Sequence, residues 1–111
     1  MSRDIEYIVD ILESARLARA YVGDSTLEEF QADVQCQDSV IRRFQVIGEA
    51  AKRVSEEGRA AWPNLPWKEM VGMRNVVIHG YDAVDLAVVW ETVTNDLPKL
   101  IAALERRDPG A

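Results

Sequence analysis

Apolar residues recur along most of this chain at the three- and four-residue spacing of an amphipathic helix. The spacing predicts a first helix over Asp4–Val22, which ends before Gly23, the first glycine of the chain. Ser25, with Glu28 three residues later, matches the capping-box pattern and predicts a second helix from there to about Cys36. Each helix has an apolar stripe that other parts of the chain must cover.

A third and longer helix is predicted to follow. Asp38 or Ser39 is expected to be its N-cap residue. Its apolar residues fall on one broad face, and they are Val40, Ile41, Phe44, Ile47, Ala50, Ala51 and Val54. From Gly58 the helical spacing breaks, and the two prolines within Trp62–Trp67 predict an ordered, aromatic-rich loop.

Two further helices are predicted in the rest of the chain. Pro66 suits the first turn of the fourth, which is expected to run to His79 with Gly80 as its left-handed C-cap residue. Asp82 is expected to cap the last helix, with Asp85 in its first turn.

Pro98 lies within the last helix and is expected to kink it or to reset its start. No segment has the alternating pattern of a strand that could compete with these helices. The elements therefore predict an all-α fold, an up-and-down bundle of roughly four to five helices. We expect a single domain over residues 1–111, with a frayed tail at 106–111.

Composition narrows the class of protein. Apolar residues make up 48% and charged residues 29%, as in a soluble globular domain. No apolar run approaches the roughly 18 residues of a membrane span. The first residues carry acids instead of the basic start and apolar stretch of a secretory signal, and Cys36 has no second cysteine to pair with. We therefore expect a cytoplasmic protein that does not act at a membrane.

Charge is unevenly distributed. The net charge of −6 argues, taken alone, against nucleic-acid binding, because contacts to phosphate need lysine and arginine. By segment, the charge is −6 over residues 1–40, +3 over 41–81 and −3 over 82–111. The middle third could therefore meet a phosphate while the rest keeps the protein soluble. The alternative is a bundle whose helices simply differ in charge.

The sequence lacks the residue patterns that most catalytic chemistries require. One histidine and one cysteine far apart, without a cluster of acids at ligand spacing, do not predict a metal site. The glycines are scattered, so no phosphate-binding loop is expected, and no serine lies in a recognisable nucleophile elbow. No cofactor is expected. The remaining candidate is the stretch Arg74–Tyr81.

Within a helix, Asn75 and His79 are four residues apart and share one face. Arg74 is one position further round, and its long side chain can bend toward the same opening. In the last turn of a helix, the dipole favours the imidazolium form of His79. A cation, an amide and an imidazole suffice for RNA cleavage without a metal, in which the 2′-hydroxyl attacks its own phosphate. DNA lacks that hydroxyl, so the mechanism selects RNA.

Each of these residues also has a structural interpretation. His79 before a glycine could be a C-terminal cap, and Tyr81 could be a core or capping aromatic. Arg74 could form a salt bridge to Glu49 or be a surface cation. Glu49 could hold the guanidinium of Arg74 in place, or it could be a solvated acid that offsets the nearby charge of Arg53 or Lys52.

The Arg74–Tyr81 stretch resembles the signature of the HepT-like toxins of the HEPN superfamily, which is an arginine, a polar residue, a few further residues, a histidine and then x-Tyr. Further blocks resemble the same family in the same order and cover residues 40–105; they are Ile47–Arg53, Pro66–Trp67, Gly72–Asn75, His79–Asp82 and Val89–Glu91. The first 35 residues match only as a pair of amphipathic helices.

The resemblance implies a HEPN-like bundle that forms a twofold dimer, with RNA (tRNA or mRNA) cleaved where two copies of the motif meet. It implies the toxin of a type VII-like toxin–antitoxin pair, with Arg74 and His79 as catalytic residues and Asn75 and Glu49 in support. The implied partner is a minimal nucleotidyltransferase antitoxin that silences the toxin by transferring AMP to Tyr81.

Two other functions fit the same residues. The chain could be a non-catalytic helical subunit of a nucleotidyltransferase complex, one that binds a nucleotide or only regulates, and the acidic net charge suits this version. It could also be a degenerate relative that only assembles, with a structural motif.

Overall fold

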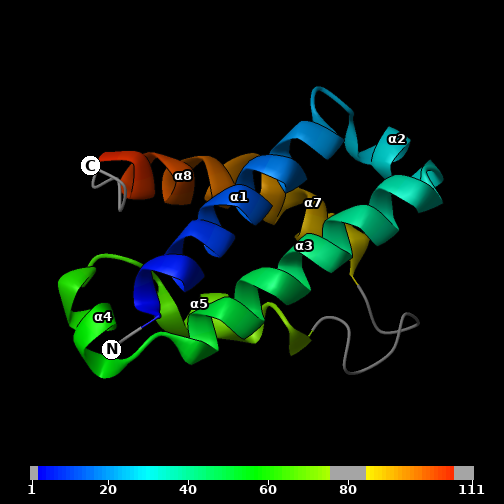
Figure 1. Ribbon diagram of the computed structural model, residues 1–111. Helices are drawn as coiled ribbons and strands as arrows, with labels where there is room; N and C mark the ends of the chain where they lie inside the picture. Colours follow the sequence, from blue (N-terminus) through cyan, green and yellow to red (C-terminus); the bar gives the residue numbers. More distant parts are fainter. Residues whose placement is uncertain (1–2, 76–84, 107–111) are drawn as a thin grey trace.

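The computed structural model describes residues 3–75 and 85–106 of the chain (Figure 1). The described residues form helices and contain no strand, so the predicted all-α class is confirmed. The elements are α1 (Asp4–Val22), α2 (Leu27–Ala32), α3 (Val34–Arg53), α4 (Glu56–Ala61), α5 (Trp67–Gly72), α7 (Leu86–Glu91), the π-helical turn η2 (Thr92–Asp96) and α8 (Leu97–Arg106). No helix in this described part is long and apolar enough to cross a membrane.

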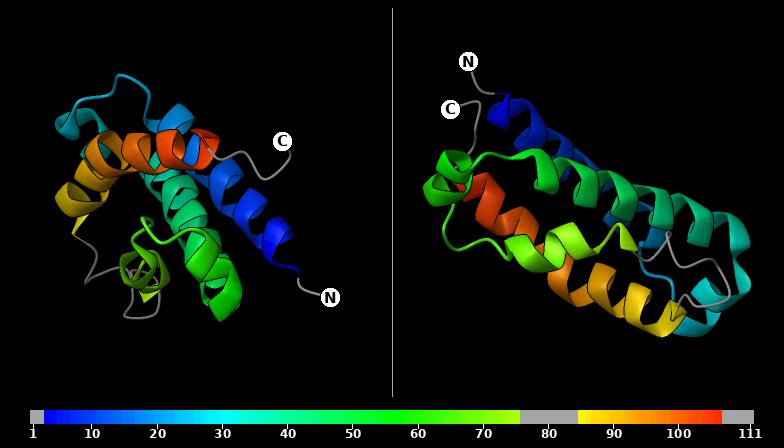
Figure 2. Two further views of the ribbon diagram at one scale, coloured as in Figure 1. Left: turned by 90° about the vertical axis from the view of Figure 1, so that its left-hand side faces the viewer. Right: turned by 90° about the horizontal axis from the view of Figure 1, so that it is seen from below.

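The helices form the predicted up-and-down bundle. The two longest helices, α1 and α3, run antiparallel and pack side by side (Figures 1 and 2). On this pair, α8 packs against α1 and α5 packs against α3. The continuous run of α7, η2 and α8 returns along the bundle in the direction of α3, opposite to α5 (Figure 1).

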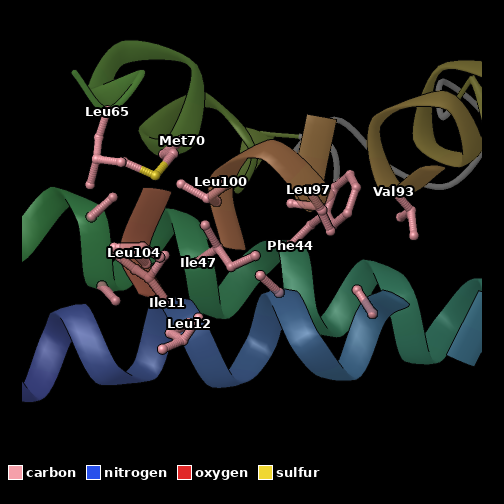
Figure 3. Close-up of a cluster of buried hydrophobic side chains, with 14 of the residues drawn as sticks. Ile11, Leu12, Phe44, Ile47, Leu65, Met70, Val93, Leu97, Leu100 and Leu104 are labelled. Carbon is pink, nitrogen blue, oxygen red and sulfur yellow. The ribbon is translucent and has the colours of Figure 1, made fainter. Parts of the chain in front are cut away.

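The core lies between these layers. Figure 3 shows Ile11 and Leu12 of α1 and Phe44 and Ile47 of α3 meeting apolar side chains from the second half of the chain, which are Leu65, Met70, Val93, Leu97, Leu100 and Leu104. All seven residues of the apolar stripe predicted for the third helix are buried. Full burial of one such side chain contributes about 1.5–3 kcal/mol, so this cluster is the main stabilising feature of the fold.

The predicted ends of the first helices need correction. Gly23 does end α1, with a φ of 52° in the left-handed region that glycine adopts most easily. The capping box, however, is Thr26 with Glu29, one residue beyond the predicted pair of Ser25 and Glu28. The hydroxyl of Thr26 accepts from the Glu29 amide at 3.1 Å, and the Glu29 carboxylate accepts from the Thr26 amide at 2.9 Å.

α2 is also shorter than predicted, and α3 begins earlier. α2 ends at Ala32, and Asp33 then caps α3 by accepting from the Cys36 amide at 3.0 Å. The predicted N-caps of the third helix, Asp38 and Ser39, therefore lie inside α3. The helical spacing did not predict this break, because only Asp33 separates α2 from α3.

A short helix, α4, lies before the predicted loop, where the helical spacing was expected to break. Ser55 caps it, with its hydroxyl accepting from the Gly58 amide at 3.0 Å. Asp4, at the start of α1, accepts from the Ser55 amide at 2.9 Å and also from the Ser55 hydroxyl. The helix is thus fixed by a contact between distant parts of the chain, which local spacing does not reveal. The aromatic part that follows is ordered as predicted, because Trp67 Nε1 donates to the carbonyl of Trp62 at 3.0 Å.

The boundaries of the last helices also differ from the prediction. Pro66 is the N-cap residue of α5, which ends at Gly72, short of His79. Asp85 is the N-cap residue of α7 and not a first-turn residue, since its carboxylate accepts from the amides of Ala87 and Val88 at 3.0 and 3.2 Å. The predicted cap residues Gly80 and Asp82 lie outside the described residues, as does the tail beyond Arg106.

Pro98 resets the last helix as predicted. The π-helical turn η2 lies directly before it, and α8 starts at Leu97. Proline has no N–H to donate and its ring collides with the carbonyl four residues earlier, so a wider turn at this point relieves the helix.

Candidate functional site

The backbone of Arg74 lies directly against α3. A Cβ atom built on Gly48 would be 2.7 Å from both the backbone nitrogen and the Cβ of Arg74. Real Cβ atoms do not approach other atoms so closely, so only glycine at position 48 permits this contact. Because glycine inside a helix costs about 1 kcal/mol relative to alanine, its presence in the middle of α3 has a structural reason, the close approach of Arg74.

The side chain of Arg74 is fixed by the next residue of α3. Arg74 Nη1 donates to Glu49 Oε1 at 2.8 Å, and the two side chains are 26% and 44% exposed, respectively. The other carboxylate oxygen of Glu49 lies 4.0 Å from Nη2 of Arg53. Both contacts proposed for Glu49 are therefore present, and the one to Arg74 is the shorter. Charge-assisted hydrogen bonds of this length are stronger than neutral ones, so the guanidinium is held in one position.

The structure places the remaining candidates as follows. Asn75 is exposed, next to Arg74. His79 and Tyr81 lie outside the described residues, which are 3–75 and 85–106. Of the candidate residues, the structure therefore brings Arg74 and Glu49 together, and the convergence of Arg74 and His79 stays a prediction.

Cys36 is not suited to act as a nucleophile. Partial burial raises the pKa of its thiol, and the charge of Asp33 raises it further. Its Sγ also lies 3.5 Å from the carbonyl of Tyr21, to which the thiol donates. Since the thiolate is the reactive form, both effects keep this cysteine inert.

Two hollows on the surface were not predicted. One, of about 280 Å³, lies between α1 and α3 and reaches Glu49; its polar lining includes Tyr7, Asp10, Arg42, Gln45, Glu49 and Arg53. A larger one, of about 530 Å³, lies between the start of α5 and the run of η2 and α8, with mainly apolar walls that include Met70, Met73 and Leu100. The sequence signal for the first was the excess of basic residues in the middle third, but spacing alone did not show that α1 would form its other wall.

Comparison with known proteins agrees with the resemblance of the motif. The family model described as ribonuclease HepT-like matches residues 11–107. Among curated relatives, "Probable ribonuclease HepT" of Thermococcus cleftensis is 37% identical over 91% of this chain and 92% of its own length. "Putative RNase MJ1380" of Methanocaldococcus jannaschii is 38% identical over 93% of this chain and 95% of its own length.

A third relative is a longer protein. "Gamma-glutamylcyclotransferase and putative RNase MJ0434" of the same archaeon is 43% identical over 90% of this chain, but this chain spans only 46% of it. No solved structure matches the chain significantly.

Proposed function

The chain belongs to the ribonuclease HepT-like family, and from that membership we propose that it is a metal-independent endoribonuclease in which Arg74 and His79 cleave RNA. The names of its relatives support a ribonuclease. The observation that carries the proposal is the anchoring of Arg74, whose backbone lies against Gly48 and whose guanidinium is held by Glu49 at 2.8 Å.

Arg74 has the properties of a phosphate-binding residue. A guanidinium has five N–H donors, and the hydrogen bond to Glu49 uses one of them. Its side chain is 26% exposed, so donors remain within reach of a ligand. In the transition state, negative charge builds up on the phosphoryl oxygens, and a cation held in advance stabilises that charge without having to reorganise. Glu49 acts as a positioning residue in this scheme.

His79 supplies the proton transfers. Its imidazole takes the proton of the 2′-hydroxyl as the 2′-oxygen attacks the adjacent phosphorus. The bond from phosphorus to the 5′-oxygen breaks, that oxygen receives a proton, and a 2′,3′-cyclic phosphate is left. Asn75 orients the phosphate by hydrogen bonding. Since the reaction needs a base and an acid and the chain has one histidine, a twofold dimer that pairs two motifs would provide both.

We further propose that the ribonuclease is the toxin of a toxin–antitoxin pair. A nucleotidyltransferase partner would transfer AMP from ATP to the hydroxyl of Tyr81 and release pyrophosphate. Tyr81 is two residues from His79 in the sequence. Each AMP adds bulk and negative charge beside the phosphate site, so the modified protein would exclude RNA by occlusion and by repulsion.

The test is RNA cleavage by the purified protein and by its His79→Ala and Arg74→Ala variants, in the presence of a metal chelator. The loss of a general acid–base should lower the cleavage rate by at least about a hundredfold, with a helical circular dichroism spectrum retained. Arg106→Ala, at the exposed end of α8, is the charge-matched control for Arg74→Ala. Full cleavage by His79→Ala would refute the mechanism, and an unfolded His79→Ala protein would identify that residue as a helix cap.

The same preparation tests the modification. The protein is mixed with the nucleotidyltransferase and ATP, and its mass is measured. Mass increments of AMP that vanish in Tyr81→Phe would support silencing at that residue. An unmodified Tyr81 in an intact complex would instead favour the non-catalytic subunit, for which the net charge of −6 is the supporting observation.

A further inference from the structure

The smaller hollow, called here the α1–α3 groove, has two arginines in its lining and lies next to the candidate site. Its lining includes Tyr7 and Asp10 from α1 and Arg42, Gln45, Glu49 and Arg53 from α3. The carboxylate of Glu49 belongs both to this lining and to the ion pair with Arg74. The groove and the proposed catalytic arginine therefore meet at one residue.

The two arginines of the groove lie on the same face of α3. Arg42 and Arg53 are eleven residues apart, which is close to three full helical turns, so both side chains project from nearly the same side. At the rise of an α-helix, their backbone positions are about 16 Å apart along the axis. Glu49 lies between them on that face. Such a row can contact phosphates that lie a few nucleotides apart on one extended strand.

Both arginines keep most of their charge available. Among the described residues, Arg42 donates to the neutral amide of Gln45 at 3.2 Å and forms no salt bridge. Arg53 lies 4.0 Å from Glu49, whose carboxylate is engaged more closely by Arg74 at 2.8 Å. Asp10 is the opposing charge on the wall formed by α1. The lining itself is charge-balanced, with two guanidiniums and two carboxylates. Because Arg74, outside the lining, engages Glu49, Asp10 is the lining carboxylate that remains to oppose the two groove arginines.

We propose that the α1–α3 groove binds the sugar–phosphate backbone of single-stranded RNA, with Arg42 and Arg53 on phosphates that flank the one at Arg74. This rests on the proposed ribonuclease function and adds the positioning residues for its substrate. Tyr7, half-buried in the wall opposite the arginines, has the guanidinium of Arg3 6.0 Å from its ring centre. The other face of this ring is the one against which a base can stack. Cationic side chains along the backbone together with an aromatic side chain for the bases are the usual arrangement for single strands bound without sequence preference.

The larger hollow suits this role less well. Its walls are mainly apolar, and the charged side chains that line it are Glu69, Asp96 and Lys99, so carboxylates outnumber cations. A phosphate backbone would be repelled there.

The experiment measures binding separately from cleavage. The probe is a fluorescein-labelled, single-stranded 2′-O-methyl oligonucleotide of mixed sequence, which lacks the attacking hydroxyl and cannot be cleaved. Anisotropy titrations at several salt concentrations compare wild type with Arg42→Ala/Arg53→Ala. We expect the double variant to bind about tenfold more weakly. Its plot of log K against log salt should have a slope smaller in magnitude by about one to two.

The matched control removes the same charge elsewhere. Arg19→Ala/Arg106→Ala takes two cations from outside the groove lining and should bind like wild type. Equal losses of affinity in both double variants would show that only net charge matters and would overturn the proposal. An unchanged affinity in the groove variant would overturn it as well. Absence of oligonucleotide binding by the wild type would also overturn it.

The two proposals fail in different ways. If the groove variant loses affinity and wild type does not cleave unmodified RNA, the proposed RNA binding by the groove is supported and the proposed ribonuclease activity is refuted. If wild type cleaves RNA and the groove variant binds normally, the proposed ribonuclease activity is supported and the RNA must bind along another surface. Loss of the nucleotidyltransferase complex in the groove variant, with normal RNA binding, would assign the groove to a protein partner instead.

Discussion

At the scale of single residues, the site depends on a glycine and on the acid beside it. Sequence reasoning found Glu49 as a possible partner of Arg74, because an acid on a neighbouring helix is a plausible counter-charge. It did not find Gly48, since a glycine within a helical pattern does not show what approaches it. The close approach of Arg74, which would lie 2.7 Å from a Cβ built on Gly48, depends on how α3 packs against the segment after α5.

Gly48→Ala should therefore destabilise the protein despite the better helix propensity of alanine. The added methyl group meets backbone atoms of Arg74, which cannot rotate away, and overpacking of this kind costs about 1–3 kcal/mol. The gain in propensity offsets up to about 1 kcal/mol of that. Urea unfolding followed by circular dichroism measures the difference.

Gly72→Ala is the matched control, because no atom of the described residues lies within 4 Å of a Cβ built there. Alanine at the end of α5 should be neutral or slightly stabilising. Equal free energies of unfolding for the two variants would show that residue 48 does not need to be glycine.

At the scale of elements, the sequence predicted helices well and their boundaries less well. Ser25 with Glu28 and Thr26 with Glu29 are the same pattern one residue apart, so spacing could not decide between them. The break at Asp33 between α2 and α3 was not predicted, because only this residue separates the two helices and the apolar spacing continues across it. α4 was missed because its N-cap residue is held by Asp4, fifty-one residues earlier.

The correct capping register has a measurable consequence. Thr26→Ala removes the hydroxyl that accepts from the Glu29 amide at 3.1 Å, and loss of an N-cap costs about 1 kcal/mol. Ser25→Ala, one residue earlier, should change the free energy of unfolding by less than half as much. A larger effect for Ser25→Ala in thermal or chemical unfolding would restore the original prediction.

At the scale of the whole molecule, the all-α class, the up-and-down order and the apolar stripe of α3 followed from periodicity, because burial of a helix face needs no distant information. The sequence also showed that the middle third of the chain is basic although the chain as a whole is acidic. The groove between α1 and α3 was not, since it depends on how two helices pack. His79 and Tyr81, outside the described residues, keep their roles as proposals.

The proposed sharing of the site between two subunits predicts that activity depends on protein concentration. If one imidazole is the base and its counterpart the acid, specific activity on RNA should fall as the dimer dissociates. Sedimentation velocity of the same samples gives the fraction of dimer. Full specific activity in samples that sediment entirely as monomer would rule out the shared site.

Glu49 has a consequence for how substitutions combine. One carboxylate oxygen engages Arg74, and the other lies 4.0 Å from Arg53. When either arginine is removed, Glu49 can pair with the other one alone. The changes in the free energy of unfolding caused by the two single substitutions are therefore not expected to add up to the change caused by the double substitution. The groove and the candidate catalytic arginine would then be thermodynamically coupled through a single acidic side chain.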